Sequence, residues 1–564
     1  MPLPDESAAK NGEGKDFLKS SSDFAIHGTD TAMSSAAPIS LPDEFNAASY
    51  FVDRHITEGR DNKVAIECEG TQVTYRELFE RVNQVGNGLR KLGVRIEERV
   101  LLLLLDTPEF AASFFGAIKI GAVPVPVNTL LKPTDYEYLL NNSRARVAIV
   151  DDSLFSLIEA IPQSRLRYLE TIVLVGGDSR SSGPSFTDIT QSSSPALEPQ
   201  LTSKDDAAFW LYSSGSTGQP KACVHLQHDM VVSTERYAKA VLKITDKDRC
   251  FSVAKLFFAY GLGNGLYFPL AVGATSILLP EAPKPHSVFD IIERHRPTLF
   301  FSVPSNYVKL LAHPVQDGRE YDLSSVRHAI SAGEALPATI FHRFKERFGV
   351  EILDAIGSTE ALHMVISNIP GAVRPGSSGK IIPGFDARIA DDSNRCVAQG
   401  ETGNLLVNAD STCASYWNQH EKTKETIEGH WIRTGDKYYQ DESGYFWYAG
   451  RADDMVKVSG VWVSPIEIER VLSEHPAVQE AAVVFHKDAD ELIKPVACVV
   501  PRDGTTGSPE LASELQSFVL SRLPVFKRPH GIKFFTELPK TATGKLQRFK
   551  LRAWMSEGLP KPSA

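Results

Sequence analysis

The sequence is poor in cysteine and has no long apolar run. Its 564 residues include only six cysteines: Cys68, Cys223, Cys250, Cys396, Cys413 and Cys498. None forms a C-x-x-C pair or has a histidine at ligand spacing, which argues against a zinc site and a disulfide framework and favours a reducing cytoplasm. The longest apolar run, Val100–Leu105, is much too short to cross a bilayer, so we predict no membrane segment.

An excess of positive charge is also missing. The formal net charge is -10 and the pI is near 5.9, which argues against nucleic acid as a partner, although a local basic patch can still bind phosphates. Globular composition and this length predict more than one domain. Residues 1–40 are rich in Ser, Ala and Gly and lack the apolar core of a signal peptide, so we expect a mobile extension there.

Strand and helix patterns alternate after this extension. ERVLLLLLD is followed by a helical pattern that begins at Thr107 and Pro108, a plausible N-cap and first helical residue, and then by VPVPVN. Further apolar strands are expected at Val147–Val150, Ile172–Val175, Ser276–Leu279, Leu299–Val303 and Val326–Ile330. This alternation predicts an α/β fold of mainly parallel sheets covered by helices.

The chain changes character near residue 450. A charged segment, GRADDMVKVSG, precedes a helix that opens with Ser464 and Glu467, which match a capping box. The strands AAVVF and PVACVV and the helix PELASELQSFVLSRL follow. We therefore predict an N-terminal domain over residues 41–450 and a smaller α+β domain over residues 451–564.

A loop rich in glycine and hydroxyl side chains is the sharpest local signal. Residues 211–221 read LYSSGSTGQPK, so several N–H and O–H donors and one lysine are available to a polyphosphate. It is not a Walker A loop, because Pro220 precedes Lys221 and no Ser or Thr follows it. The alternative to a phosphate-binding loop is a flexible linker. The strand-like AAFWLY before the loop and the Pro-Lys pair after it favour the phosphate site.

This loop resembles the signature of the adenylate-forming superfamily, which comprises acyl-CoA synthetases, nonribosomal-peptide adenylation domains and firefly-type luciferases. Other segments resemble its further motifs, in the family's order: Ala332–Glu334, Asp354–Glu360, Thr434–Asp436, Gly450–Asp454 and Pro539–Lys545. The resemblance implies an ATP site made of Ser213, Ser214, Gly215, Ser216, Thr217, Gly218, Lys221, Ala332, Gly333, Glu334, Asp354, Ile356, Gly357, Ser358, Thr359, Asp436, Arg451 and Lys545.

Each short motif alone has a simpler interpretation. A T-G-D string is usually a turn, an S-T-E string often begins a helix, and a single lysine is usually a solvated charge. Five such segments in one order over more than 300 residues favour the family. The resemblance then implies that Thr359 binds the α-phosphate, Glu360 holds Mg²⁺, Asp436 clamps the ribose and Lys545 drives adenylation.

The implied reaction has two halves. A carboxylate attacks the α-phosphorus of ATP, and positioning and charge compensation by Lys545, Thr359, Glu360 and Thr217 dominate catalysis. Coenzyme A then attacks the acyl-adenylate. The resemblance implies a small β subdomain in the N-terminal domain and a mobile C-terminal domain that turns about Asp453 and brings up a thiol channel near Ser459 and Gly460.

The segment AKLFFAYGLGN, residues 254–264, suggests which acid is activated. With Gly357–His363, it resembles benzoate-CoA ligases, which implies an aromatic pocket. Phe257, Phe258 and Tyr260 would otherwise be ordinary core, and a lone histidine is usually structural. Because Ala355 and Ala361 are small, benzoate, 2-aminobenzoate and hydroxybenzoates are hard to separate. The implied acid-binding residues are Phe258, Ala259, Tyr260, Gly261, Ala332, Ile356, Gly357 and His363.

Three alternatives stay open. The adenylate can pass to a carrier protein instead of CoA. A luciferase-like oxidation is disfavoured because the chain ends in KPSA instead of a peroxisomal SKL address. A nucleotide-binding regulator without chemistry is disfavoured because Lys545 and Glu360 are both present. The expected partners are an aromatic carboxylate, ATP with Mg²⁺, and coenzyme A, with a homodimer or a carrier protein as further options.

Overall fold

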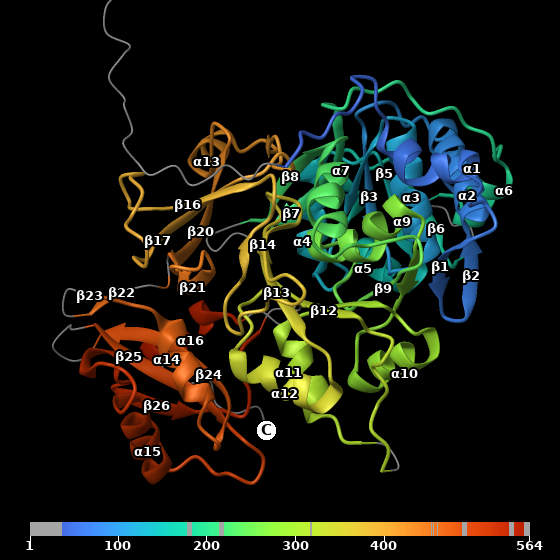
Figure 1. Cartoon of the computed structure of the whole chain (residues 1–564). Helices are drawn as coiled ribbons and strands as arrows, with labels where there is room; N and C mark the ends of the chain where they lie inside the picture. The colour runs from blue at the N-terminus through green and yellow to red at the C-terminus, as the bar shows by residue number, and fades with distance from the viewer. Residues whose placement is uncertain are drawn as a thin grey trace, which may run out of the picture. The chain divides into compact units, whose positions relative to one another are not determined.

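The computed structural model describes residues 36–177, 183–213, 219–315, 318–452, 454, 456–458, 461–487, 493–540 and 546–557. Several predicted site residues lie outside these ranges: Ser214, Gly215, Ser216, Thr217, Gly218, Asp453, Ser459, Gly460 and Lys545. The described part is an α/β structure with a large N-terminal domain and a smaller C-terminal domain, which confirms the predicted fold class (Figure 1).

One sheet has four parallel strands, β4 (Val123–Pro126), β3 (Arg99–Leu103), β5 (Val147–Asp151) and β6 (Thr171–Val175), in that order. Helix α3 (Pro108–Lys119) links β3 to β4, as the sequence predicts. Pro108 is the first helical residue, but the Thr107 side chain makes no capping hydrogen bond. The helix is held by burial instead, because Phe110, Phe114 and Phe115 are inaccessible to solvent.

A second sheet has nine strands. Their order is β15 (Lys380–Ile381), β14 (Met364–Ser367), β13 (Ile352–Gly357), β12 (His328–Ser331), β11 (Leu299–Ser302), β9 (Arg249–Ser252), β10 (Thr275–Leu278), β1 (Val64–Cys68) and β2 (Thr71–Thr74). The strands from β13 to β1 are parallel, and β14, β15 and β2 pair antiparallel. Because carboxyl ends of parallel strands share one edge, the segments after β11, β12 and β13 come together there.

Helices fill the space around the two sheets. Helix α2 (Tyr75–Lys91) packs against α3, and both contribute to one apolar core with side chains of β1 and β3. The other helices of the N-terminal domain are α1 (Arg54–Thr57), α4 (Pro133–Ser143), α5 (Phe155–Glu159), α6 (Phe186–Gln191), α7 (Asp229–Ser233), α8 (Ala259–Leu262), α9 (Phe268–Val272), α10 (Pro285–His295), α11 (Pro304–Ala312), α12 (Ala338–Phe348) and α13 (His420–Thr426).

Two antiparallel sheets complete the N-terminal domain. Strands β7 (Ala207–Ser213) and β8 (Lys221–Leu226) flank the predicted phosphate loop, and β18 (Ser415–Tyr416) pairs with β8. A five-stranded sheet joins β16 (Asp386–Ala390), β17 (Gly403–Asn408), β20 (Trp431–Gln440) and β19 (Ile427–Glu428), with β21 (Phe446–Arg451) beside β20. These are the β substructures on which the outer parts of the site are built.

The C-terminal domain has its own apolar core. Its elements are β22 (Val456–Val458), β23 (Val461–Val463), α14 (Pro465–Ser473), β24 (Val478–Lys487), β25 (Ile493–Pro501), α15 (Pro509–Leu520), β26 (Gly531–Phe534) and α16 (Arg548–Glu557). The predicted capping box of α14 is wrong. The Ser464 side chain makes no capping hydrogen bond: its hydroxyl is turned toward the carbonyl of Ala449, to which it donates, and Glu467 pairs with Lys527 at 2.6 Å.

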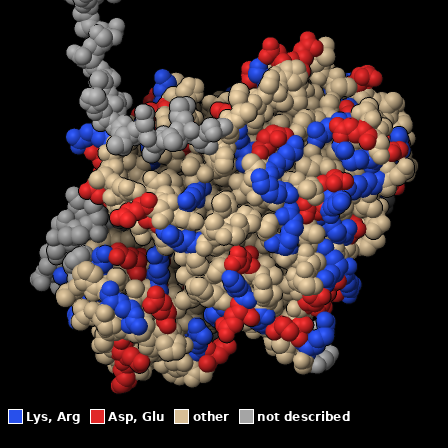
Figure 2. Space-filling model, viewed as in Figure 1, with Lys and Arg blue, Asp and Glu red and all other residues tan. Residues whose placement is uncertain are grey.

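Surface charges of both signs are intermixed on the face seen in Figure 2. Each of the six cysteines has a free thiol, and Cys396 is the exposed one among them. No helix in the described ranges combines the length and the apolar character that crossing a membrane requires.

Candidate active site

Three distant segments meet at the carboxylate of Glu360. Ser213, at the end of β7, donates its hydroxyl proton to Oε1 of Glu360 at 3.2 Å, and Tyr416 of β18 donates to the same oxygen at 2.7 Å. Burial, followed by the neighbouring Glu360, raises the pKa of Tyr416, so its hydroxyl stays protonated as a donor. No hydrogen bond from the described residues reaches Oε2. The carboxylate is therefore fixed through one oxygen.

Both ends of the predicted phosphate loop attach to this cluster. Ser213 precedes the loop, and Lys221, which follows it, places its Nζ 4.3 Å from the ring centroid of Tyr416. A cation over an aromatic face is attracted by the ring. Of the predicted loop residues, Ser213 and Lys221 are thus brought to Glu360, while residues 214–218 lie outside the described ranges.

His363 lies in a buried cage of aromatic rings. Its ring centroid is 4.5 Å from that of Phe268, 5.4 Å from Tyr237 and 5.8 Å from Tyr260. Nε2 lies 3.1 Å from Oδ1 of Asn264, and buried Nδ1 has no hydrogen-bond partner in the described part of the chain. Burial lowers the pKa of His363 to about 3, so the imidazole is neutral at pH 7.

Two glycines make the space for His363. A Cβ at Gly263 would lie 2.5 Å from Cδ2 of His363, and a Cβ at Gly357 would lie 2.2 Å from the His363 carbonyl oxygen. Leu362, just before the histidine, is buried and has a φ of 66°, a left-handed conformation that is costly for a bulky side chain. Close packing and backbone strain therefore fix the end of the 358–363 turn.

The predicted acyl wall, residues 254–264, lies against the carboxyl ends of parallel strands. The Tyr260 hydroxyl is 3.1 Å from the carbonyl oxygen of Ser302 and 3.2 Å from that of Ile330. The Phe257 and Phe258 rings are 4.4 Å apart, and Phe257 is buried. Ala259 is also buried, and a Cβ at Gly261 would meet the Lys255 carbonyl at 2.1 Å. The wall is thus rigid from Phe257 to Gly261.

Asp354 ties two of the predicted nucleotide segments together. Its carboxyl is 4% exposed, and Oδ2 accepts the backbone N–H of Leu336 at 3.3 Å. Burial raises the pKa of Asp354 well above its ordinary value. The contact links β13 to the segment that contains Ala332, Gly333 and Glu334. Asp354 therefore anchors the backbone of this region, and Ile356 follows it on the same strand, half-buried.

The predicted ribose clamp and the predicted arginine meet on the antiparallel sheet. Asp436 of β20 stands opposite Arg451 of β21, and Nη1 of Arg451 donates to Oδ1 of Asp436 at 3.2 Å. The same Nη1 donates to the carbonyl of Thr434 at 3.1 Å. The structure thus pairs two residues that the sequence predicts for one nucleotide, although they are fifteen positions apart.

Sequence reasoning missed three groups that hold this site. Tyr416 binds Glu360, Asn264 binds His363, and His225 lies with Nε2 2.9 Å from the carbonyl oxygen of Thr359. No local pattern marks Tyr416, which reaches the site through the pairing of β18 with β8. His225 and Asp229, four positions apart just after the loop, offered a weak signal.

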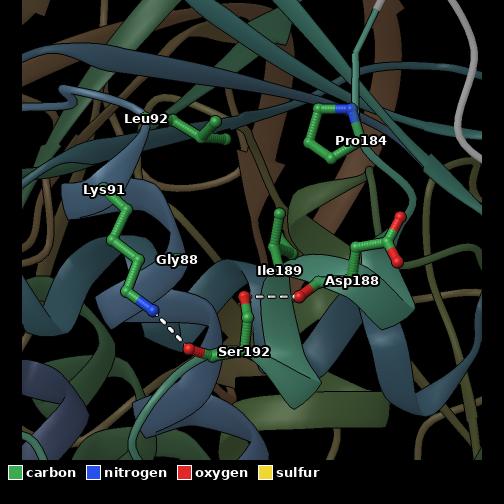
Figure 3. Close-up of a pocket in the computed structure, with 7 residues that line it drawn as sticks. All are labelled: Gly88, Lys91, Leu92, Pro184, Asp188, Ile189 and Ser192. Carbon is green, nitrogen blue, oxygen red and sulfur yellow. Dashed lines mark hydrogen bonds between the residues drawn. The ribbon is translucent and has the colours of Figure 1, made fainter.

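A shallow cavity elsewhere contains none of these residues. It lies between α2 and α6, where Lys91 donates to the carbonyl of Ser192 and Ile189 forms part of the lining (Figure 3). The Ser192 hydroxyl is occupied by the carbonyl of Asp188 at 2.6 Å. Its lining groups are engaged in local helix contacts.

Comparison with known proteins identifies the family. The AMP-binding enzyme family matches residues 52–417, and the AMP-binding enzyme C-terminal domain matches residues 467–545. A benzoate–CoA ligase of Thauera aromatica is 46% identical over 517 residues, which cover 91% of this chain and 97% of the relative.

Solved structures agree with this result. The anthranilate CoA ligase AuaEII, in complex with anthranoyl-AMP, superimposes with a TM-score of 0.87 at 43% identity and covers 92% of this chain and 98% of its own. A benzoate CoA ligase from Burkholderia xenovorans LB400 has a TM-score of 0.83 at 43% identity and covers 90% of this chain and 100% of its own. Two family matches in the expected order and relatives aligned along nearly their whole length lead to one conclusion: the chain belongs to the AMP-binding enzyme family of adenylate-forming ligases.

Proposed function

We propose that this protein is an AMP-forming aryl-CoA ligase that takes benzoate or a close relative. The observation that carries the proposal is the cage around His363: a neutral, buried imidazole among aromatic rings, three residues from Glu360. Aromatic faces and edges suit a flat apolar ring, and the adjoining turn offers polar groups to its carboxylate. The similar benzoate and anthranilate ligases support the same assignment.

Glu360 is the proposed magnesium ligand. Mg²⁺ prefers oxygen ligands and is commonly held by one or two carboxylates together with substrate phosphates. The fixed carboxylate of Glu360, with Oε2 not engaged by the described residues, fits that role. Within the described ranges, no group of three or more His, Cys, Asp or Glu residues forms a metal cage, so the phosphates are the expected further ligands. When bound, Mg²⁺ supplies charge neutralisation to the transferring phosphoryl group.

The remaining residues have separate proposed roles in adenylation. We assign Thr359 and Thr217 to the phosphate oxygens, Asp436 to the ribose hydroxyls and Lys545 to the charge that develops at the α-phosphate. Ser213 and Tyr416 orient the Glu360 carboxylate. The carboxylate of the acid forms a bond to the α-phosphorus, and pyrophosphate leaves.

For the second half, we place a mobile domain at residues 451–564, with its hinge at Asp453. Rotation withdraws Lys545 and brings Ser459 and Gly460 to the channel for the CoA thiol. The thiolate attacks the acyl carbonyl, the acyl–oxygen bond breaks, and AMP leaves. One movement of the C-terminal domain thus separates the two half-reactions, which need different residues at the same position in the site.

Substituted acids are a second set of candidate substrates, favoured by one observation. Nδ1 of His363 is buried and lacks a hydrogen-bond partner among the described residues. Because Nε2 faces the amide oxygen of Asn264 as a donor, Nδ1 of the neutral ring is an acceptor. An amino or hydroxyl group on the substrate ring can satisfy it, which supports 2-aminobenzoate and hydroxybenzoates beside benzoate.

A substrate panel tests the proposal. AMP release would be measured with CoA and, in turn, benzoate, 2-aminobenzoate, three hydroxybenzoates and fatty acids of several lengths. We expect the highest kcat/KM with a one-ring aromatic acid. A preference for fatty acids with acyl chains of eight or more carbons would overturn the aryl assignment. Replacing CoA by a holo-carrier protein tests the acceptor, and faster turnover with the carrier protein would reassign the second half.

A further inference from the structure

A buried histidine–aspartate pair stands behind the turn that contains Thr359. His225 comes from β8 and Asp229 is the first residue of α7; both side chains are fully buried. Nδ1 of His225 is 2.8 Å from Oδ2 of Asp229, and Nε2 is 2.9 Å from the Thr359 carbonyl oxygen. The ring also stacks on Phe209, with centroids 5.1 Å apart. The pair therefore links the hairpin that carries the phosphate loop to the 358–360 turn.

The hydrogen bonds of His225 fix the orientation of its ring. The Thr359 carbonyl can only accept, so Nε2 donates to it, and Nδ1 faces the carboxylate of Asp229. Oδ2 of Asp229 also accepts the backbone N–H of Leu226 at 3.0 Å, which holds the carboxylate in place. Both ring nitrogens are therefore engaged, and the donor at Nε2 has a fixed direction.

Other charged and polar groups surround the pair. On the far side of Asp229, Nε2 of His228 is 3.2 Å from Oδ1, and its Nδ1 is 2.8 Å from the Lys204 carbonyl and 3.4 Å from Asp205. His228 is partly exposed and does not touch the Thr359 turn. Tyr267 also lies within electrostatic reach of Asp229, and Glu360 follows Thr359 in the chain.

We infer that His225, oriented by Asp229, is a positioning residue of the nucleotide site. Its hydrogen bond fixes the Thr359 carbonyl. Because the peptide is planar and trans, the N–H of Glu360 then points to the opposite side, and no hydrogen bond from the described residues takes it up. The pair thus fixes the direction of the Glu360 N–H, a backbone donor beside the Thr359 hydroxyl and the Glu360 carboxylate. The inference rests on the proposed binding of nucleotide by this turn.

Two variants test the pair. His225→Gln replaces the fixed ring by a flexible amide, and Asp229→Asn removes the carboxylate that orients the ring. We expect each to lower kcat/KM for ATP in pyrophosphate exchange about tenfold, with the KM for the aryl acid unchanged. His286→Gln, at an exposed histidine of α10, is the control and should stay within about twofold.

The split between the two substrates gives a readout that a purely structural role would not produce. A positioning role predicts a loss of kcat/KM for ATP with no change in the KM for the aryl acid, whereas general loosening of the site would affect both. If His225→Gln does not fold, as judged by thermal unfolding, Asp229→Asn decides instead. Wild-type kcat/KM for ATP in the folded variants would overturn the inference.

Thr359→Val separates this inference from the proposed function. A large loss of pyrophosphate exchange in Thr359→Val, together with none in His225→Gln and Asp229→Asn, refutes the role of the pair and leaves the nucleotide site in place. No loss in Thr359→Val would refute the proposed nucleotide role of the turn itself.

Discussion

The two sides of the candidate active site are held by opposite kinds of interaction. On the nucleotide side, Glu360 is fixed by two hydroxyl donors, and Thr359 by a buried imidazole. On the acyl side, His363 is fixed by packing: aromatic rings surround it, and two glycines leave room for it. We therefore expect changes of charge to impair the first side and changes of side-chain volume to impair the second.

The largest effect is expected from removing the charge of Glu360. Glu360→Gln keeps the volume and an oxygen that can accept from Ser213 and Tyr416, but it weakens magnesium binding. We expect kcat for adenylation, measured by pyrophosphate exchange, to fall about 100-fold or more. Glu351 forms a surface ion pair with Lys345, and Glu351→Gln is the matched control. It should change kcat for adenylation less than about twofold. A mild effect at Glu360 would show that charge does not govern this side.

A single added methyl group should break the acyl side. Gly263→Ala would place a Cβ 2.5 Å from the His363 ring, whose cage leaves it no room to retreat. Overpacking of this kind costs about 1–3 kcal/mol, so kcat/KM for benzoate should fall about tenfold or more while the KM for ATP holds. Gly265→Ala is the control, because its Cβ would meet the end of the Leu256 side chain at 3.1 Å. Equal effects of both variants would contradict the close-packing argument.

The free energy of unfolding at low pH should show that His363 is neutral in the folded protein. Its folded pKa, about 3, lies below the unfolded value of about 6.5, so the unfolded chain binds the extra proton as the pH falls. The free energy of unfolding is unaffected by this group above pH 6.5 and falls by about 1.4 kcal/mol per pH unit between there and pH 3. His363→Gln should remove about 2 kcal/mol of the loss between pH 7 and pH 5, measured by urea unfolding.

A substitution that removes no titratable group provides the control for this titration. Asn306→Gln, at a buried amide, should leave the pH dependence of the unfolding free energy as in the wild type. His55, whose pKa burial also lowers to about 3, is present in all three proteins and cancels in the differences. An unchanged slope in His363→Gln would mean that the acyl side holds a charged imidazole, which would erase the contrast between the two sides.

The smallest effect is expected at Tyr416. Tyr416→Phe removes one of the two donors to Glu360 and leaves the hydroxyl of Ser213 in place. We expect adenylation to slow about three- to tenfold, because Ser213 still holds the carboxylate and the net loss is about 0.5–1.5 kcal/mol for one hydrogen bond. Tyr445→Phe, whose hydroxyl bonds the Ala372 carbonyl, is the control. In a Glu360→Gln background, Tyr416→Phe should add little, and full additivity would show that the two residues act independently.

Prediction from sequence succeeded where the information is local. The β3–α3–β4 unit and the strands β5, β6, β10, β11 and β12 follow from apolar runs and helical spacing, and they occur within a few residues of the expected positions. The capping box at Ser464 failed, because a hydrogen bond to the Ala449 carbonyl, fifteen positions away, turns the hydroxyl away from the start of the helix. Thr107 likewise begins its helix without a capping bond, since burial stabilises α3 instead.

The sequence by itself determined the family, the order of the motifs and the kinds of side chain that phosphates and a flat ring require. Only the tertiary structure decided which groups hold those side chains: Tyr416 on Glu360, Asn264 on His363, and His225 on Thr359. The physical reason is that these contacts join residues 56 to 134 positions apart. Strand register and helix packing bring such residues together, and neither can be deduced from the spacing of neighbouring residues.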